Sequence, residues 1–598
     1  MNAGAYPSLP SPRRRKPASG AAEAVAAAPV AQPVRVPLAR ENKRSPRRRG
    51  CLIFGGASLT ALSLSLAHHM SDGDASMSHA DGDNLVTRTT PGADTFAALA
   101  DAQFDDLFSQ AARLIPSTAP ADAAEVIAAA ATKREPVVWT RSFASDWRAH
   151  RVWDIASLQE RLPWLVARAQ AEGEFVLTAP QRGNSAPLLQ GAPAWEPLRP
   201  EMRNISVETL LTASPASGHS SSSYYYYSGT LHDAATEHWA TAQLLSELEP
   251  TAPLHLEDAP PLLPDDGVVP PTAASLAANR TSLRLWLTSD RVLARTHYDK
   301  GHNLLCVVRG QKRVLLWPPE ELPSLHLYPA VHAGHRQSQV SLLRLTHVSA
   351  ALASGAPPRA LGALGEFDLV DARSLLGRRG ARSVELDAGS MLYIPPYWAH
   401  AVYSSTPSVA LAAFSTSWEQ ARWARAAWHA APLGRFAAGG LCSKARGAAM
   451  VIAEFLHASA PTLGGTPREI LAHLYAARFA PLYGALHAPS RATDASTSLA
   501  ECLGAAARAL PPGAPERDVA LHHRMAQYAS TVAALLVEPD RSADGRVFAR
   551  GVAVELAGDY VEEMAGWAVG ADGTWRLIRQ LALAEELDDE IGRAPEPR

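Results

Sequence analysis

Cysteine is scarce in this 598-residue chain, which has only Cys51, Cys306, Cys442 and Cys502. These four residues are too few and too scattered for a disulfide framework, and their spacing does not form a paired zinc site. Cys306 lies in an apolar run, which predicts a buried and unreactive thiol. Cysteine therefore defines neither the redox compartment nor the chemistry of this protein.

The chain also lacks a large excess of charge of one sign, because its formal net charge is −3. Residues 1–50 hold 11 of its 56 Lys and Arg residues but only two of its 59 acidic residues, Glu23 and Glu41, so the remainder is acidic. Phosphate recognition needs clustered cations, which argues against a broad nucleic-acid-binding face on the folded part. A protein or peptide partner is favoured over nucleic acid.

Long apolar runs are absent except at 51–67, so the chain is not a polytopic membrane protein. This uncharged run follows three arginines at 47–49, an order typical of a signal anchor or of an organellar or secretory presequence. A poorly buried helix, or a basic tail on a cytoplasmic or nuclear protein, is the alternative. We predict a basic disordered tail over 1–50, a targeting or membrane-anchor segment over 51–67 and a polar tether over 68–94.

The chain is longer than a domain built around one hydrophobic core usually is, and its 47% apolar residues are enough to form several folded units. An Ala-rich helical flank is expected over 95–133, followed by a β domain over 134–420. From Ser282 the chain contains short runs such as LRLWL, NLLCVV, KRVLLW, MLYI and SVALAAF, which are typical of an all-β sandwich or barrel with an insertion near 350–383. A helical domain is expected over 421–598.

Two apolar stripes at helical spacing mark this C-terminal part and predict either core packing or a surface for a partner. The first stripe is the basis for predicting a homodimer through the C-terminal helices. The stripes consist of Leu521, Met525, Tyr528, Val532 and Leu535, and of Leu556, Tyr560, Met564 and Trp567.

The segment THYDKGHNLLCVV places two metal-binding side chains two residues apart. On a strand, His297 and Asp299 share one face while Tyr298 points to the other. The best third ligand is His400 in MLYIPPYWAHAV. Two histidines and one carboxylate leave coordination sites open, which is the arrangement of non-haem Fe(II) centres, although a zinc hydrolase uses similar ligands.

Three passages carry a resemblance to a known family: HYDKGHNLLCVVRGQKRVLLWPP at 297–319, LYPAVHAGHRQSQVSL at 327–342 and LDAGSMLYIPPYWAHAV at 386–402. They resemble the JmjC or cupin-like family of Fe(II)- and 2-oxoglutarate-dependent oxygenases. The likeness is greatest to the branch that contains the asparaginyl hydroxylase inhibiting hypoxia-inducible factor. The resemblance implies a mainly β catalytic core, a double-stranded β-helix or jelly roll, with a helical N-terminal flank and a helical C-terminal domain.

The resemblance also implies a site and a reaction. His297, Asp299 and His400 would be the catalytic iron ligands. The co-substrate 2-oxoglutarate would be bound through Lys312, with further contacts from Asn303 and Tyr226. With O2, such an enzyme hydroxylates or demethylates a protein side chain and releases succinate and CO2.

Two other classes of function stay open. A cupin that binds or scaffolds without catalysis is favoured by Ala294, where the family usually has Thr or Ser, and by Phe414, near which it often has Asn. A metal-dependent isomerase or hydrolase is opposed by Lys312.

Overall fold

The computed structural model describes most of residues 131–175, 201–249, 281–342, 380–487, 499–503, 515–538 and 549–588, with short pieces between 105 and 117. The predicted tail, anchor and tether over 1–94 lie outside the described residues. No helix in the described part is both long and apolar enough to cross a membrane. The anchor at 51–67 stays a prediction.

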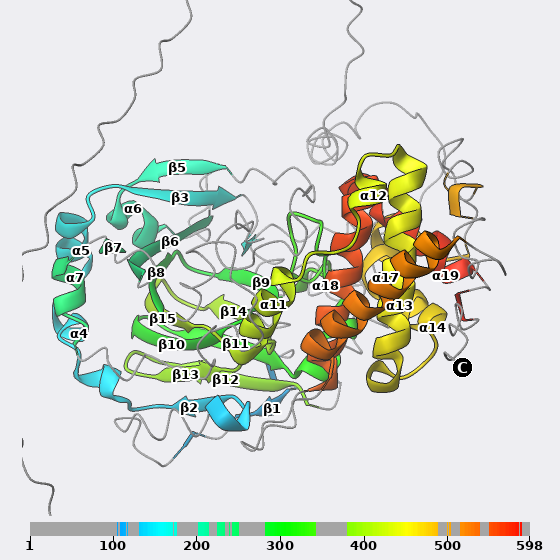
Figure 1. The fold of residues 1–598 in the computed structure, drawn as a ribbon. Coiled ribbons are helices and arrows are strands. Elements are labelled where there is room, and N and C mark those ends of the chain that lie inside the picture. The colour runs from blue at the N-terminus through cyan, green and yellow to red at the C-terminus, as the bar shows by residue number, and fades with distance from the viewer. Residues whose placement is uncertain are drawn as a thin grey trace, which may run out of the picture. The chain divides into compact units, whose positions relative to one another are not determined.

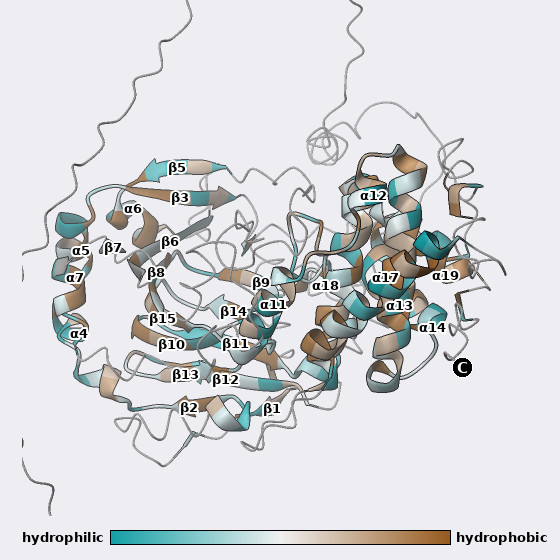
Figure 2. Cartoon of the chain, in the orientation of Figure 1, coloured by the Kyte–Doolittle hydropathy of each residue, from teal (hydrophilic) through white to brown (hydrophobic). Residues whose placement is uncertain are grey.

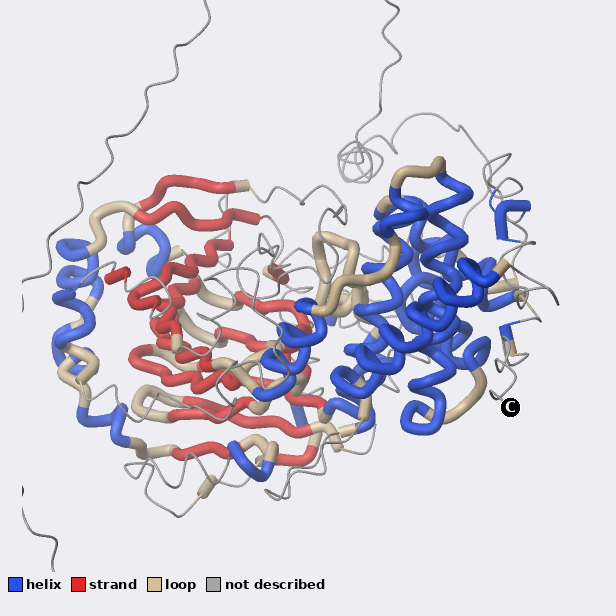
Figure 3. Tube along the Cα trace, in the orientation of Figure 1, coloured by secondary structure: helices blue, strands red, loops and turns tan. Residues whose placement is uncertain are grey.

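Two sheets form the β part, and Figure 3 shows the strands gathered on one side of the C-terminal helices. Neighbouring strands are antiparallel except for the pairs β1·β12 and β4·β9. One sheet has the order β1 (Ala112–Arg113), β12 (Arg382–Leu386), β11 (Lys312–Trp317), β14 (Ala399–Ser404), β9 (Val292–Tyr298) and β4 (Glu174–Phe175). The other has the order β2 (Val137–Trp139), β13 (Met391–Ile394), β10 (His302–Arg309), β15 (Ser408–Ser415), β8 (Ser282–Thr288), β6 (Tyr224–Asp233), β3 (Leu165–Gln170) and β5 (Met202–Ile205), and β7 (His238–Trp239) pairs with β6.

Short helices border the second sheet, and longer helices form the C-terminal part (Figure 1). The short ones are η1 (Phe143–Asp146), α4 (Ala149–Val152), α5 (Ile155–Arg161), α6 (Val207–Thr212) and α7 (Ala242–Ser246), with η4 (Pro319–Leu325) after β11. The C-terminal ones are α11 (Trp418–Trp428), α12 (Gly434–Ala437), α13 (Leu441–Leu463), α14 (Pro467–Leu474), the π-helical turn η6 (Tyr475–Phe479), α15 (Ala480–Tyr483), α17 (Glu516–Leu536), α18 (Arg550–Val569), η7 (Ala571–Gly573) and α19 (Thr574–Leu583).

Alternation along the strands of the first sheet divides their side chains between two cores. On β14, Ala401 and Tyr403 join the large cluster that contains the C-terminal helices. Val402 packs instead on the cluster between the two sheets. Hydrophobic residues recur along both the central strands and these helices (Figure 2). The predicted strand runs and the predicted β fold class are confirmed, and residues 89–598 form one compact unit.

The C-terminal part is helical as predicted, and α17 and α18 carry the two apolar stripes. Met525 and Val532 are fully buried inside the chain, in the same cluster as Leu556 and Met564. The stripe is therefore core, and it does not supply the surface for a second copy on which the dimer prediction rested.

Two further features differ from expectation. Within the flank expected to be helical, Ala112–Arg113 form a strand that pairs with β12, while most of 95–133 lies outside the described residues. Cys442 and Cys502 form a disulfide with their Cα atoms 5.0 Å apart, a pairing that their spacing did not indicate. Cys306 is a free, fully buried thiol, as predicted.

Candidate metal centre

The three predicted metal ligands meet on two adjacent strands. His400 on β14 lies directly opposite His297 on β9, and their ring centroids are 4.3 Å apart. Asp299 follows the end of β9, two residues after His297. One ligand atom from each of the three residues lies within 4.8 Å of the others. Among the described residues this is the one such cluster of His, Cys, Asp or Glu.

A β-bulge in β9 directs these ligands to the inside. Ala294 pairs with Val402 and His297 pairs with His400, so two residues of β9 face one residue of β14 between these pairs. Ala294 packs in the interior with Val402. Simple alternation from Ala294 would bring Tyr298 to the inner face, whereas the bulge brings His297 and Asp299 there. Tyr298 is buried on the opposite side, in the cluster that contains the helices.

Backbone carbonyls set the tautomer of both histidines. The Nδ1 atom of His297 lies 2.7 Å from the carbonyl oxygen of Arg295, and that of His400 lies 3.0 Å from the carbonyl oxygen of Trp398. A carbonyl can only accept, so each Nδ1 carries a proton, and in the neutral imidazole it is then Nε2 that presents a lone pair. His400 Nε2 lies 3.6 Å from Asp299 Oδ2, as two atoms facing one ion would.

The charge states suit a divalent cation. Burial and the neighbouring His400 lower the pKa of His297 to about 4. Burial alone would raise the pKa of Asp299, but His400, His297 and Arg336 lower it overall. Asn303 Nδ2 donates to Asp299 Oδ2 at 3.1 Å, and Arg336 Nη1 lies 3.8 Å from Asp299 Oδ1. At neutral pH the site thus offers a neutral imidazole from His297 and an ionised carboxylate from Asp299, which Asn303 and Arg336 keep in place.

Lys312 is a buried cation on the same inner surface. It is 4% exposed and shares the inner side of β11 with Val314 and Leu316. Its Nζ donates to Ser404 Oγ at 2.9 Å, and burial lowers the pKa of Lys312 to about 7. Ser404 is four residues beyond His400 on β14, about 13 Å along the strand.

Ser404, the acceptor of this ammonium, belongs to a group of three buried hydroxyl side chains. Thr288 Oγ1 lies 2.9 Å from Ser404 Oγ and 2.7 Å from Ser408 Oγ, and all three side chains are buried. An ammonium has three donors, and no carboxylate of the described residues contacts this one. Its surroundings therefore suit an anionic ligand, which would supply the missing acceptors. Ser404 was missed in the sequence, although its spacing from His400 places it on the same strand face.

The two remaining predicted residues also face the interior. Asn303 on β10 is held by Asp299, and its Oδ1 atom is buried without a hydrogen-bond partner. Tyr226 on β6 stacks on Phe175 with 5.3 Å between ring centroids and meets Trp286 edge-on at 5.4 Å. Burial raises the pKa of Tyr226, and the charge of Asp299 contributes to the rise. All six predicted residues thus line the space between the sheets.

Residues 123–418 match the model of a family described as the cupin-like domain. Similar proteins include a lysine-specific demethylase, JMJ31, of Arabidopsis thaliana, which is 33% identical over 135 residues covering 23% of this chain and 21% of the relative. The human bifunctional peptidase and (3S)-lysyl hydroxylase JMJD7 is 28% identical over 155 residues, 26% of this chain and 48% of the relative.

A tRNA wybutosine-synthesizing protein 4 of Emericella nidulans is 29% identical over 157 residues, 26% of this chain and 12% of that protein. The chain thus matches less than half the length of each of these relatives. The sheets, the His-Asp-His cluster and these matches agree on one class: residues 123–418 belong to the cupin-like (JmjC) family. The matches do not single out the asparaginyl hydroxylase branch.

Proposed function

We propose that this protein is an Fe(II)- and 2-oxoglutarate-dependent oxygenase that hydroxylates or demethylates a protein side chain. The observation that carries the proposal is the buried ammonium of Lys312, which lies on the same inner surface as the triad and has one hydroxyl acceptor among the described residues. A metal-binding module without a co-substrate has no need of this cation, because burying an ammonium without a counter-charge costs free energy.

Each residue of the site has a distinct task. His297, Asp299 and His400 would hold Fe(II), with Nδ1–H groups bonded to backbone carbonyls so that both imidazoles keep their orientation. Lys312 and Ser404 would bind the distal carboxylate of 2-oxoglutarate. When bound, iron and 2-oxoglutarate together supply the oxidising chemistry that consumes O2 and yields succinate and CO2.

Other residues orient ligands and exclude water. The Asn303 amide holds one oxygen of Asp299 and thereby limits rotation of that carboxylate. Val402 and Phe414 pack on the apolar cluster between the sheets and keep this surface dry. A dry site strengthens the charge-assisted contact from Lys312.

The substrate class rests on the acidic folded part and on relatives whose names include a lysine-specific demethylase and a lysyl hydroxylase. We infer a protein or peptide side chain as the group that is oxidised. Incubation with peptide libraries, followed by mass spectrometry, separates hydroxylation, which adds oxygen, from demethylation, which removes a methyl group.

The direct test measures succinate formed from 2-oxoglutarate by the purified full chain with Fe(II) and O2. We expect turnover in the wild type, and its loss on treatment with a chelator and on His297→Ala, Asp299→Ala or His400→Ala, because two ligands hold a ferrous ion poorly. The control is His473→Ala, which removes an exposed histidine of α14 and should keep full activity.

One result would replace this proposal. Ala294 places a methyl group, without a hydroxyl, in the apolar cluster with Tyr226 and Phe175. If the wild type binds Fe(II) but forms no succinate with or without peptides, the protein is a metal-binding scaffold of the cupin-like family. Ala294→Thr would then be the first substitution to test for a gain of succinate formation.

A further inference from the structure

Three carboxylates lie buried on one side of α18, among helices that are otherwise packed by apolar residues. Glu555, Asp559 and Glu562 are spaced by four and three residues and are at most 2% exposed. This spacing places them in one row along the helix. Buried carboxylates are costly without partners, so the contacts of this row indicate what it holds.

Arg478 of the turn η6 contacts all three carboxylates. Its guanidinium lies 2.5 Å from Glu555 Oε2, 3.0 Å from Asp559 Oδ1 and 2.8 Å from Glu562 Oε1. The three carboxylates hold the pKa of Arg478 well above its usual value in spite of burial. Glu555 and Arg478 therefore form a contact within the helical part of the chain.

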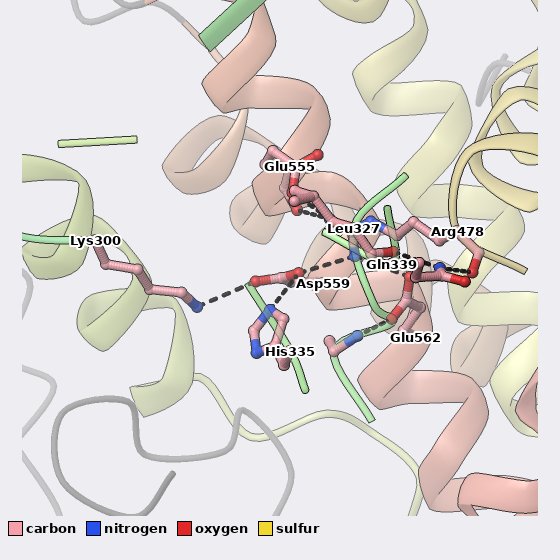
Figure 4. A network of polar contacts seen from close by, with 9 residues as sticks. Lys300, Leu327, His335, Gln339, Arg478, Glu555, Asp559 and Glu562 are labelled. Carbon is pink, nitrogen blue, oxygen red and sulfur yellow. Dashed lines mark hydrogen bonds and ion pairs between the residues drawn. The ribbon is translucent and has the colours of Figure 1, made fainter. Parts of the chain in front are cut away.

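Asp559 differs from Glu555 because it also reaches the β part, as Figure 4 shows. Lys300 Nζ lies 3.1 Å from Asp559 Oδ2, and His335 Nε2 lies 3.1 Å from Asp559 Oδ1. Burial lowers the pKa of His335 to about 4, and a neutral imidazole with its proton on Nε2 donates this bond. Both partners are buried, at 6% and 7% exposure.

The two partners of Asp559 in the β part, Lys300 and His335, are each the immediate neighbour of a residue at the metal centre. Lys300 follows Asp299 directly. His335 precedes Arg336, whose carbonyl oxygen accepts from the backbone N–H of Tyr298 at 3.1 Å and whose guanidinium faces Asp299 at 3.8 Å. Arg336 has a positive φ of 70°, a strained backbone that its surroundings must hold.

The loop after Arg336 also pairs with β9, the strand that carries His297 and leads to Asp299. Gln337 forms an isolated bridge with His297. Glu562 of the same row accepts a hydrogen bond from the backbone N–H of Ala330, which lies earlier in this loop. The helix α18 thus contacts both the residue that follows Asp299 and the loop that pairs with β9.

We propose that Asp559 is a positioning residue of the metal centre: by binding Lys300 and His335 it holds the end of β9 and the loop at Arg336 in the register that brings Asp299 to the two histidines. The C-terminal helices are then part of the metal-binding unit. This inference rests on the proposed function only for the identity of the metal, since a preformed three-ligand site needs the same support for any divalent ion.

The test uses Co(II) as the probe, because titration of the full chain with Co(II) reports metal affinity without turnover. Asp559→Asn keeps the size of the side chain but weakens its bonds to both partners. We expect the Kd for Co(II) to rise about tenfold or more, the range typical when a group supporting a metal ligand is lost. The visible absorption of bound Co(II) should also change as the ligand geometry loosens.

Glu555→Gln is the matched control, because it removes a buried carboxylate from the same helix and the same Arg478 but keeps Asp559, which forms the bonds to Lys300 and His335. It should lower Tm while leaving the Kd for Co(II) within twofold of wild type. Equal losses of Co(II) affinity in the two variants would overturn the proposal in favour of a general packing role. An unchanged Kd in Asp559→Asn would overturn it outright.

His335 supplies a second pair of variants if Asp559→Asn fails to fold. His335→Gln keeps a donor for Asp559 and should bind Co(II) nearly as wild type, whereas His335→Leu should bind it several-fold more weakly. Equal affinity in both variants would contradict the proposal. Wild-type protein that binds Co(II) but makes no succinate would refute the proposed function alone, so the two failures are distinguishable.

Discussion

The side chain of Lys312 lowers the stability of the ligand-free protein but favours the binding of an anionic ligand. Its ammonium is buried with a single hydroxyl acceptor in the part of the chain that the structure describes, and burial lowers its pKa to about 7 from an ordinary value of 10.5. Without a ligand, this group therefore destabilises the fold at neutral pH. A bound dicarboxylate would pair with the ammonium and remove the free-energy cost of burying it alone. Ligand binding would therefore stabilise the folded protein.

Replacing this cation by an apolar side chain of similar length separates the two effects. We expect Lys312→Met to raise the free energy of unfolding of the ligand-free protein by about 1 kcal/mol or more, because a desolvated charge is removed. We expect it to weaken 2-oxoglutarate binding about ten- to a hundredfold, the value of one charge-assisted contact. Thermal unfolding and calorimetric titration measure the two, and Lys133→Met, at an exposed position, should change neither. A destabilised Lys312→Met protein would contradict the interpretation.

The same group predicts a pH dependence of stability. Between pH 7 and 10 the lysine is protonated in the unfolded chain and increasingly neutral in the folded one, so the unfolded state binds more protons. The Lys312 contribution should therefore make the ligand-free protein more stable as the pH rises through this range. The test compares urea unfolding of wild type and Lys312→Met from pH 6.5 to 9.5. Parallel curves for the two proteins would count against a perturbed lysine.

At the scale of elements, the position of α18 depends on a glycine. A Cβ atom on Gly551 would lie 1.9 Å from the carbonyl oxygen of Pro319 in η4. The first turn of α18 can approach the β part only because this side chain is absent. The close contact fixes the helix that presents Asp559 to Lys300.

Enlarging this glycine should push the two elements apart. We expect Gly551→Ala to lower the free energy of unfolding by about 1–3 kcal/mol, the usual cost of overpacking. Gly434→Ala is the control, because nothing lies within 4 Å of its added methyl group and α12 tolerates alanine. Denaturant unfolding of both variants measures the difference, and equal stability would show that the contact at Pro319 relaxes freely.

For the whole molecule, the β part and the C-terminal helices share one hydrophobic core. Leu293, Tyr298 and Tyr403 of the first sheet are buried in the same cluster as residues of α13, α17 and α18. The boundary predicted near residue 420 stays a prediction, and this cluster has members on both sides of it. The helices cover the outer face of the sheet whose inner face holds the metal ligands.

Removing residues 421–598 should leave the first sheet without its cover. We expect the shortened chain to aggregate or to bind hydrophobic dyes, because buried aromatic side chains become exposed. Cooperative unfolding of a monomeric protein ending at 420 would show that the β part folds alone. Solubility and dye binding in the full chain supply the reference.

Deletion of residues 1–70 tests the N-terminal targeting prediction, because the core of 89–598 is formed without them. We expect the truncated chain to keep its Tm but to leave the membrane or organelle fraction in which the full chain is found. The same distribution of both forms between the fractions would exclude a targeting role for 51–67.

Local pattern in the sequence was enough for the apolar strand runs after Ser282, the helical stripes and the shared face of His297 and Asp299, because side-chain alternation depends only on neighbouring residues. Three other features needed the folded chain. The bulge in β9 arises from pairing with β14 and turns the ligands inward. The hydroxyl partner of Lys312, Ser404, lies 92 residues away in the chain. Asp559 reaches Lys300 across 259 residues, and no local pattern encodes which distant side chains will share a buried charge.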